Sequence, residues 1–122
     1  MISLAAMALK LDRTHQLILQ YFHLIQEPDG IRVTDSDVLI HWVYGLDLEE
    51  EYTEHQRHSV SDALWNLKEQ GWLEITTEMI YRGKQGLPPK RYDTVKAWIK
   101  DGRIYNNRTN HFTPFQDFFD GT

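Results

Sequence analysis

The stretch from residue 53 to residue 95 constrains the fold most, because one strongly periodic helix is followed at once by strand patterns around a turn-rich loop. Between Thr53 and Gln70 apolar residues recur at three- and four-residue steps, the period of a helix with one buried face. Gly71 is expected to end this helix in a left-handed conformation. The expected buried stripe consists of Val60, Ala63, Leu64 and Leu67.

Short segments rich in β-branched and aromatic residues follow that helix, at 72–76, 79–82 and 90–95. Such composition is typical of strands. The last two segments are separated by residues 83–89, which contain two Gly and two Pro and therefore cannot continue a strand. The pattern predicts an antiparallel β-hairpin, and so an α+β fold.

Two further helices are predicted before residue 53. The first spans Asp12 to Gln26, with Asp12 or Thr14 as its N-cap, and a short strand is predicted at 31–33. The second begins at Thr34, whose hydroxyl is expected to cap it, and ends at Gly45. Its expected buried face consists of Val38, Leu39, Trp42 and Val43. Residues 12–95 are thus expected to form a three-helix core with a small hairpin.

Size and composition indicate a single soluble domain. The chain has 122 residues, 41% of them hydrophobic and 12% aromatic, which is enough for one core and too apolar for a disordered chain. No run of about 18 apolar residues occurs, so no membrane span is expected. The absence of cysteine excludes disulfides and thiolate zinc sites and favours a cytoplasmic protein. Residues 1–11 are expected to be a lead-in to this domain.

The net charge of −5 is unevenly distributed along the chain. Residues 27–56 contain nine acidic residues and one basic residue, whereas residues 57–108 contain ten basic and six acidic residues. The second half is therefore net basic, and an acidic total does not exclude a face that binds nucleic acid.

Two segments resemble winged helix-turn-helix regulators of the MarR and PadR types. Residues 58–75, HSVSDALWNLKEQGWLEI, resemble their recognition helix and the strand after it, and residues 81–92, YRGKQGLPPKRY, resemble their wing hairpin. The likeness covers roughly residues 12–95 and carries more information about the fold than about any one family. It implies an α+β winged helix-turn-helix with a C-terminal extension at 96–122.

The resemblance implies sequence-specific binding of double-stranded DNA by a transcriptional regulator, or by a factor in phage or plasmid DNA transactions, acting as a homodimer. The third helix would enter the major groove, and wing cations would reach phosphates. The DNA-binding residues expected on this basis are Arg57, His58, Ser59 and Ser61 of the helix and Arg82, Lys84, Gln85, Lys90 and Arg91 of the wing.

The outward face of the third helix also supports an alternative, a winged-helix module that binds protein without reading DNA. Asp62 and Glu69 lie on that face and would repel phosphates. Trp65 lies there too, and an exposed Trp is more typical of a protein interface than of base recognition.

The C-terminal tail carries a second set of candidate partner-binding residues. After a short helical pattern around residues 97–99, its aromatic spacing predicts a short helix with one aromatic face. That face either docks a second copy or another protein, or folds back and completes the chain's own core. The residues concerned are Phe112, Phe115, Phe118 and Phe119.

Catalysis and cofactor binding are not expected. The chain lacks the nucleophile-elbow, phosphate-loop and zinc-protease motifs. His55 and His58, with Glu51 one turn earlier, have a spacing that can hold a metal, but no further strong ligand set accompanies them. The sequence predicts no enzyme, no metal site and no cofactor.

Overall fold

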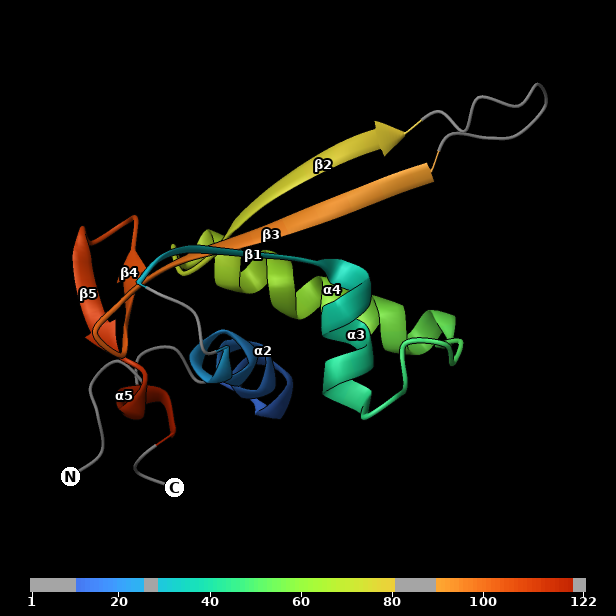
Figure 1. Cartoon of the computed structure of the whole chain (residues 1–122), viewed down its shortest axis with the longest axis horizontal. Coiled ribbons are helices and arrows are strands. Elements are labelled where there is room, and N and C mark those ends of the chain that lie inside the picture. The colour runs from blue at the N-terminus through green and yellow to red at the C-terminus, as the bar shows by residue number, and fades with distance from the viewer. Residues whose placement is uncertain (1–10, 26–28, 81–89, 120–122) are drawn as a thin grey trace.

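An antiparallel sheet organises the computed structural model, which describes residues 11–25, 29–80 and 90–119 (Figure 1). Its central strand, β3, pairs with β1 over residues 94–99, with β2 over 90–96 and with β4 over 99–100. The α+β class is as predicted. In chain order the elements are α2 (Arg13–Leu24), β1 (Gly30–Asp35), α3 (Ser36–Tyr44), α4 (Glu54–Glu69), β2 (Glu74–Ile80), β3 (Lys90–Lys100), β4 (Arg103–Asn106), β5 (His111–Pro114) and α5 (Gln116–Phe119).

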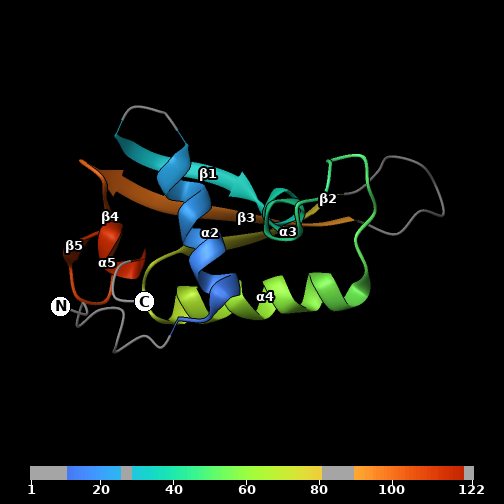
Figure 2. The same ribbon diagram turned by 90° about the horizontal axis from the view of Figure 1, so that it is seen from below.

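The three longer helices lie on one face of the sheet and enclose the core, as the views in Figures 1 and 2 show together. All three predicted helices are present, and the side chain of Asp12 caps the first by accepting from the backbone N–H of His15. None of the described helices is long and apolar enough to cross a bilayer.

The N-cap of the second helix lies one residue later than predicted. Thr34 lies in β1, where its hydroxyl donates to the Tyr21 hydroxyl at 3.3 Å, and the helix cap is Asp35, which accepts from the Val38 N–H at 2.9 Å. An aspartate is as good a cap as a threonine, so the residue that caps the helix is set by how far β1 stays paired with β3. The strand therefore runs over six residues instead of the three predicted.

The buried face of α3 also differs from the prediction. Leu39 is buried as expected, but Ile40 and His41 are buried beside it, while Trp42 is exposed at the rim. The Trp42 indole donates to the Leu17 carbonyl oxygen at 2.8 Å, and its ring packs edge-on against Tyr21. The indole N–H thus finds an acceptor at the boundary with α2 that it would lack inside the core.

The two strands that flank the expected loop are longer than predicted, and two further strands, β4 and β5, follow them. One strand, β2, replaces the two segments expected at 72–76 and 79–82. The helical pattern expected at 97–99 is wrong, because these residues lie in β3, where Val95, Ala97 and Ile99 are buried and Trp98 is exposed. This alternation has the period of a strand with one buried face. The loop expected at 83–89 lies outside the described residues.

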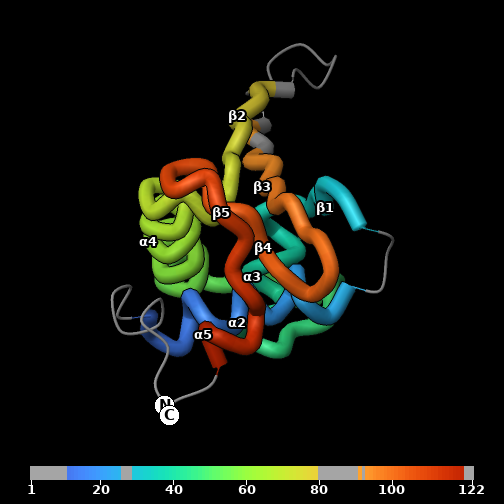
Figure 3. The backbone as a smooth tube through the Cα atoms, turned by 90° about the vertical axis from the view of Figure 1, so that its left-hand side faces the viewer, coloured from blue at the N-terminus to red at the C-terminus, as the bar shows by residue number. Residues whose placement is uncertain are grey.

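The C-terminal segment belongs to the same core. The boundary expected between residues 95 and 96 falls inside β3, and β4 and β5 follow as a hairpin beside the C-terminal end of α4 (Figure 3). Gly71 has a positive φ of 95°, as predicted, and its carbonyl oxygen accepts from the N–H of Asn107. The buried Asn106 side chain donates to the Gln70 carbonyl oxygen at 2.8 Å. The hairpin thereby satisfies carbonyl groups at the end of the helix.

Candidate nucleic-acid interface

Helix α4 begins with a reciprocal capping box. The Thr53 hydroxyl accepts from the backbone N–H of Gln56 at 3.1 Å, and the Gln56 side chain accepts from the N–H of Thr53 at 2.9 Å. These two bonds satisfy donors that a helix start otherwise leaves without partners. The predicted stripe of Val60, Ala63, Leu64 and Leu67 is buried, which sets the rotation of the helix.

That rotation divides the predicted contact residues of α4 into two groups. Arg57, Ser61 and Trp65 lie on the side that faces the β2–β3 hairpin and line a cleft there. His58 is exposed and does not line the cleft, and Ser59 is half-buried and does not line it either. The helix thus presents a cleft-facing side and a fully solvated side, and the exposed Asp62 and Glu69 do not line the cleft.

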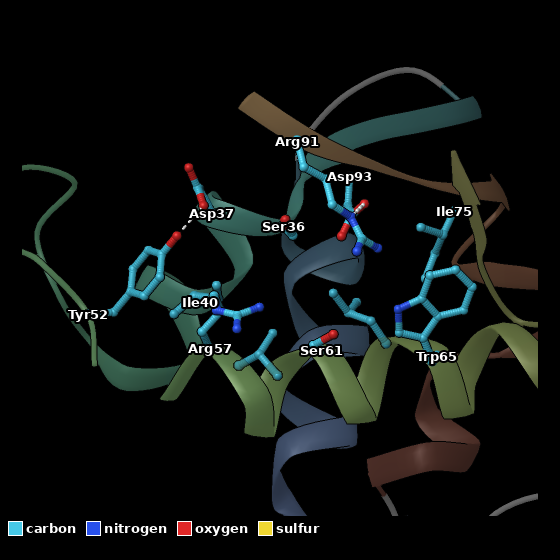
Figure 4. A pocket seen from close by; sticks show the side chains of 12 residues that line it. Ser36, Asp37, Ile40, Tyr52, Arg57, Ser61, Trp65, Ile75, Arg91 and Asp93 are labelled. Atoms are coloured by element: carbon cyan, nitrogen blue, oxygen red, sulfur yellow. Dashed lines mark hydrogen bonds and ion pairs between the residues drawn. The ribbon is translucent and has the colours of Figure 1, made fainter. Parts of the chain in front are cut away.

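The cleft has a volume of about 230 Å³ and lies between α3, α4 and the two hairpin strands (Figure 4). Part of its lining is apolar, contributed by Ile40, Val60, Leu64 and Ile75. Two guanidinium groups reach it from opposite walls, Arg57 from α4 and Arg91 from β3. Among the predicted site residues, the structure brings together Arg57, Ser61, Trp65 and Arg91.

Each of these two arginines is paired with a carboxylate. Arg57 donates to Glu54 from Nε at 3.2 Å and from a terminal nitrogen at 2.8 Å, and this contact raises the pKa of Arg57 and lowers that of Glu54. Arg91 Nε donates to Asp93 at 3.1 Å, and Asp93 also accepts from the Thr77 hydroxyl. Because a guanidinium has five donors, each pairing leaves donors for a phosphate while holding the group in position.

The carboxylates of the cleft are the part of the site that the sequence did not reveal. Asp93 follows Arg91 by two residues, so strand alternation puts both on one face of β3. Asp37 lies in the first turn of α3 and accepts from the Tyr52 hydroxyl. Burial and this hydrogen bond raise the pKa of Tyr52 to about 12, so the hydroxyl keeps its proton. The two-residue spacing of Arg91 and Asp93 is the sequence signal that indicates this pairing.

His41 ties the cleft's α3 wall to the acidic connector before α4. Its Nδ1 lies 2.7 Å from the Asp37 carbonyl oxygen and its Nε2 lies 2.8 Å from the Glu50 carbonyl oxygen. Only the doubly protonated ring can donate to both oxygens. These two bonds, assisted by the charges of Asp37 and Glu50, raise the pKa of His41 in the folded chain.

We therefore expect the contribution of His41 to stability to depend on pH. A pKa that folding raises gives a contribution that is fully present below the ordinary value of 6.5 and is lost as pH rises through the folded value. Urea unfolding of the wild type and of His41→Gln at a series of pH values measures it. The difference in unfolding free energy between the two proteins should shrink as pH rises, and a constant difference would contradict the assignment.

Of the remaining hairpin candidates, Lys90 alone lies within the described residues. Arg82, Lys84 and Gln85 lie outside the described residues. Lys90 is the first residue of β3 and pairs with Ile80 across the hairpin.

The expected partner-binding aromatic residues do not form one exposed face. Phe115 and Phe118 are 0% and 1% exposed, so they complete the chain's own core and are not available on its surface. Phe119 is partly buried against the same core, and Phe112 lies on the opposite face of the sheet against Trp98. The Trp65 ring is half-buried, with the Lys68 ammonium 4.5 Å from its centre. Of the two alternatives for the tail, folding back onto the chain's own core is therefore the one that holds for Phe115 and Phe118.

Comparison of the chain with models of protein families, with curated proteins and with solved structures gives no match. Among the described residues, no group of three or more His, Asp or Glu side chains is arranged to hold a metal ion.

Proposed function

We propose that this chain is a winged helix-turn-helix protein that binds double-stranded DNA, with α4 in the major groove and the β2–β3 hairpin against the flanking backbone. The supporting topology is the order helix, strand, helix, helix, hairpin, with β3 paired between β1 and β2. In this arrangement α4 and the hairpin diverge around one open cleft, as a recognition helix and wing do.

The observation that carries the proposal is the pair of guanidinium groups on the two sides of the cleft. Arg57 and Arg91 come from the two elements that a duplex would contact together, and both are partly exposed. Fixed arginines beside a helix suit phosphate contacts, which position a protein on DNA. A role in transcription or in a phage or plasmid DNA transaction is the biological expectation that follows.

Replacing Lys84, Lys90 and Arg91 together with alanine tests the proposal. We expect the salt slope of duplex binding to fall by about 3 and the affinity to fall by roughly a hundredfold at low salt. Fluorescence anisotropy with a labelled mixed-sequence duplex measures both quantities.

The matched control replaces Arg13, Lys100 and Arg103, which do not line the cleft, with alanine. It removes the same charge and should leave the salt slope nearly unchanged. Equal losses of affinity and salt slope in the two triple variants would show that only the total charge matters. Unchanged duplex binding by the Lys84, Lys90 and Arg91 variant would contradict the proposed interface.

A second candidate function is a winged-helix module that binds a basic protein. The connector between α3 and α4 favours it, because its carboxylates are exposed around the strongly exposed Leu48. The exposed acidic residues are Asp47, Glu49, Glu50 and Glu51 of the connector and Glu54, the first residue of α4. An apolar side chain within an acidic rim suits a protein partner better than DNA. Absence of duplex binding by the wild type at low salt would favour this function.

A further inference from the structure

The sheet face that points away from the helices carries a cluster of aromatic and aliphatic side chains. It is here called the outer patch and is defined as Ile31, Val33, Trp98, Tyr105 and Phe112. The rings of Trp98, Tyr105 and Phe112 pack together with centres 4.7–5.2 Å apart. Trp98 is 45% exposed, and Ile31, its partner in register on β1, is 68% exposed. The free face of an antiparallel sheet is ordinarily polar, so this surface differs from a solvated one.

Basic side chains lie on both sides of the indole in the outer patch. The alternation of β3 places Lys96 and Lys100 on the same face as Trp98, two residues before it and two residues after it. Arg103 lies opposite Lys100 on β4, and its guanidinium is 5.6 Å from the centre of the Phe112 ring. The outer face of β3 therefore has the order cation, ring, cation.

The carboxylates near these cations leave both lysines available. Glu74 of β2 lies across from Lys96. Asp101, in the turn between β3 and β4, lies 3.8 Å from Arg103, and its backbone N–H donates to Asp29. Neither lysine forms an ion pair with any described residue. A phosphate backbone that follows β3 would thus meet an ammonium group on each side of the indole.

A hollow of about 210 Å³ opens beside the rings. On the outer face it is lined by Ile31, Lys96, Trp98 and Tyr105, so aromatic, aliphatic and cationic side chains meet in one place. Aromatic side chains on which bases stack, accompanied by cations that contact the backbone, are the means by which proteins bind single-stranded nucleic acid. A duplex keeps the faces of its bases stacked inside and cannot offer them to these rings.

We propose that the outer patch binds a single strand of DNA, with bases stacked on its rings and phosphates against its flanking cations. Ile31 and Val33 favour DNA over RNA, because they lie beside the indole and suit the methyl group of thymine. An RNA 2′-hydroxyl at these side chains would lose water without gaining a hydrogen bond.

The outer patch lies on the face opposite the helices, whereas the cleft lies between α3, α4 and the hairpin (Figure 1). The proposal therefore stands independently of duplex binding. Absence of duplex binding by the wild type would remove the proposed function and leave the single-strand site in place.

Fluorescence anisotropy at low salt with a labelled thymidine strand of about 12 nucleotides tests the stacking. Trp98→Val keeps an apolar side chain that favours strands but removes the ring, and it should lower the affinity roughly 5- to 100-fold. Trp98→Phe keeps a ring and should retain most of the affinity. Tyr44→Val removes an exposed ring from α3 and should bind as the wild type does.

The salt dependence of the same binding tests the flanking cations. The double variant Lys96→Gln with Lys100→Gln should lower the salt slope by about 1.4, since each phosphate contact of a single strand contributes about 0.7. Neither lysine is buried, so circular dichroism should show the wild-type fold. The matched control, Arg13→Gln with Lys68→Gln, removes the same charge from exposed positions on α2 and α4 and should keep the slope.

Four results overturn the proposal. The wild type does not bind the thymidine strand at up to about 100 μM protein. Trp98→Val binds it as tightly as the wild type, which would place the strand elsewhere on the chain. A uridine strand of equal length binds more tightly than the thymidine strand, which would assign the site to RNA. Vesicles containing phosphatidylserine bind the wild type and the thymidine strand does not, which would assign the outer patch to a membrane surface.

Discussion

Replacing Phe115 with alanine is expected to lower the free energy of unfolding by about 3–5 kcal/mol, because a fully buried ring is removed and leaves a cavity. The ring lies just after β5 with its centre 4.8 Å from that of His23 on α2. It thus joins the last described segment to the first helix. Urea unfolding followed by circular dichroism measures the loss.

Gln116→Ala is the control for this substitution, because Gln116 is the next residue and is exposed. It should change the unfolding free energy by no more than about 0.5 kcal/mol. A loss below about 1 kcal/mol for Phe115→Ala would mean that the C-terminal segment is not part of the core in solution.

Gly71→Ala is expected to destabilise the protein more than the same change at Gly45, although both glycines have a positive φ. At Gly45 a Cβ meets nothing within 4 Å, so only the left-handed backbone opposes it, at about 1–2 kcal/mol. At Gly71 it would lie 2.5 Å from Asn106 Oδ1 and 3.0 Å from the Arg108 backbone nitrogen. The β4–β5 hairpin would have to move away from the end of α4.

That movement breaks the hydrogen bonds from Asn106 to the Gln70 carbonyl oxygen and from Asn107 to that of Gly71. At about 0.5–1.5 kcal/mol for each bond, Gly71→Ala should lose about 1–3 kcal/mol more than Gly45→Ala. Parallel denaturation of the two variants provides the comparison. Equal losses would show that the hairpin does not dock on α4.

Local patterns predicted the elements whose signals lie close together in sequence. The period of α4, its start at Thr53 and the positive φ of Gly71 all follow from neighbouring residues. The hairpin strands were predicted in type because β-branched residues flank a Gly/Pro-rich loop. The resemblance to winged helix-turn-helix regulators, and not a local pattern, indicated Arg57, Ser61 and Arg91 as candidates.

The features that local patterns did not predict depend on contacts between segments that are far apart in the sequence. Trp98 follows Ala97 in a pattern that fits a short helix, but pairing with Ile31 of β1 places Trp98 in β3. The tail phenylalanines have spacing that suits an exposed helix face, and only the position of α2 shows that Phe115 packs inside. The pairing of Asp37 with Tyr52 likewise joins residues 15 positions apart.

Nuclear magnetic resonance titration of the labelled chain with a mixed-sequence DNA duplex at low salt tests the central claim most directly. The account predicts that the backbone signals of Arg57, Ser61 and Arg91 shift or broaden together, while those of Ile31 and Val33 on the opposite face stay unchanged. Loss of these shifts at high salt is expected as well. A spectrum that duplex DNA leaves unchanged, or shifts confined to the face of Ile31 and Val33, would contradict it.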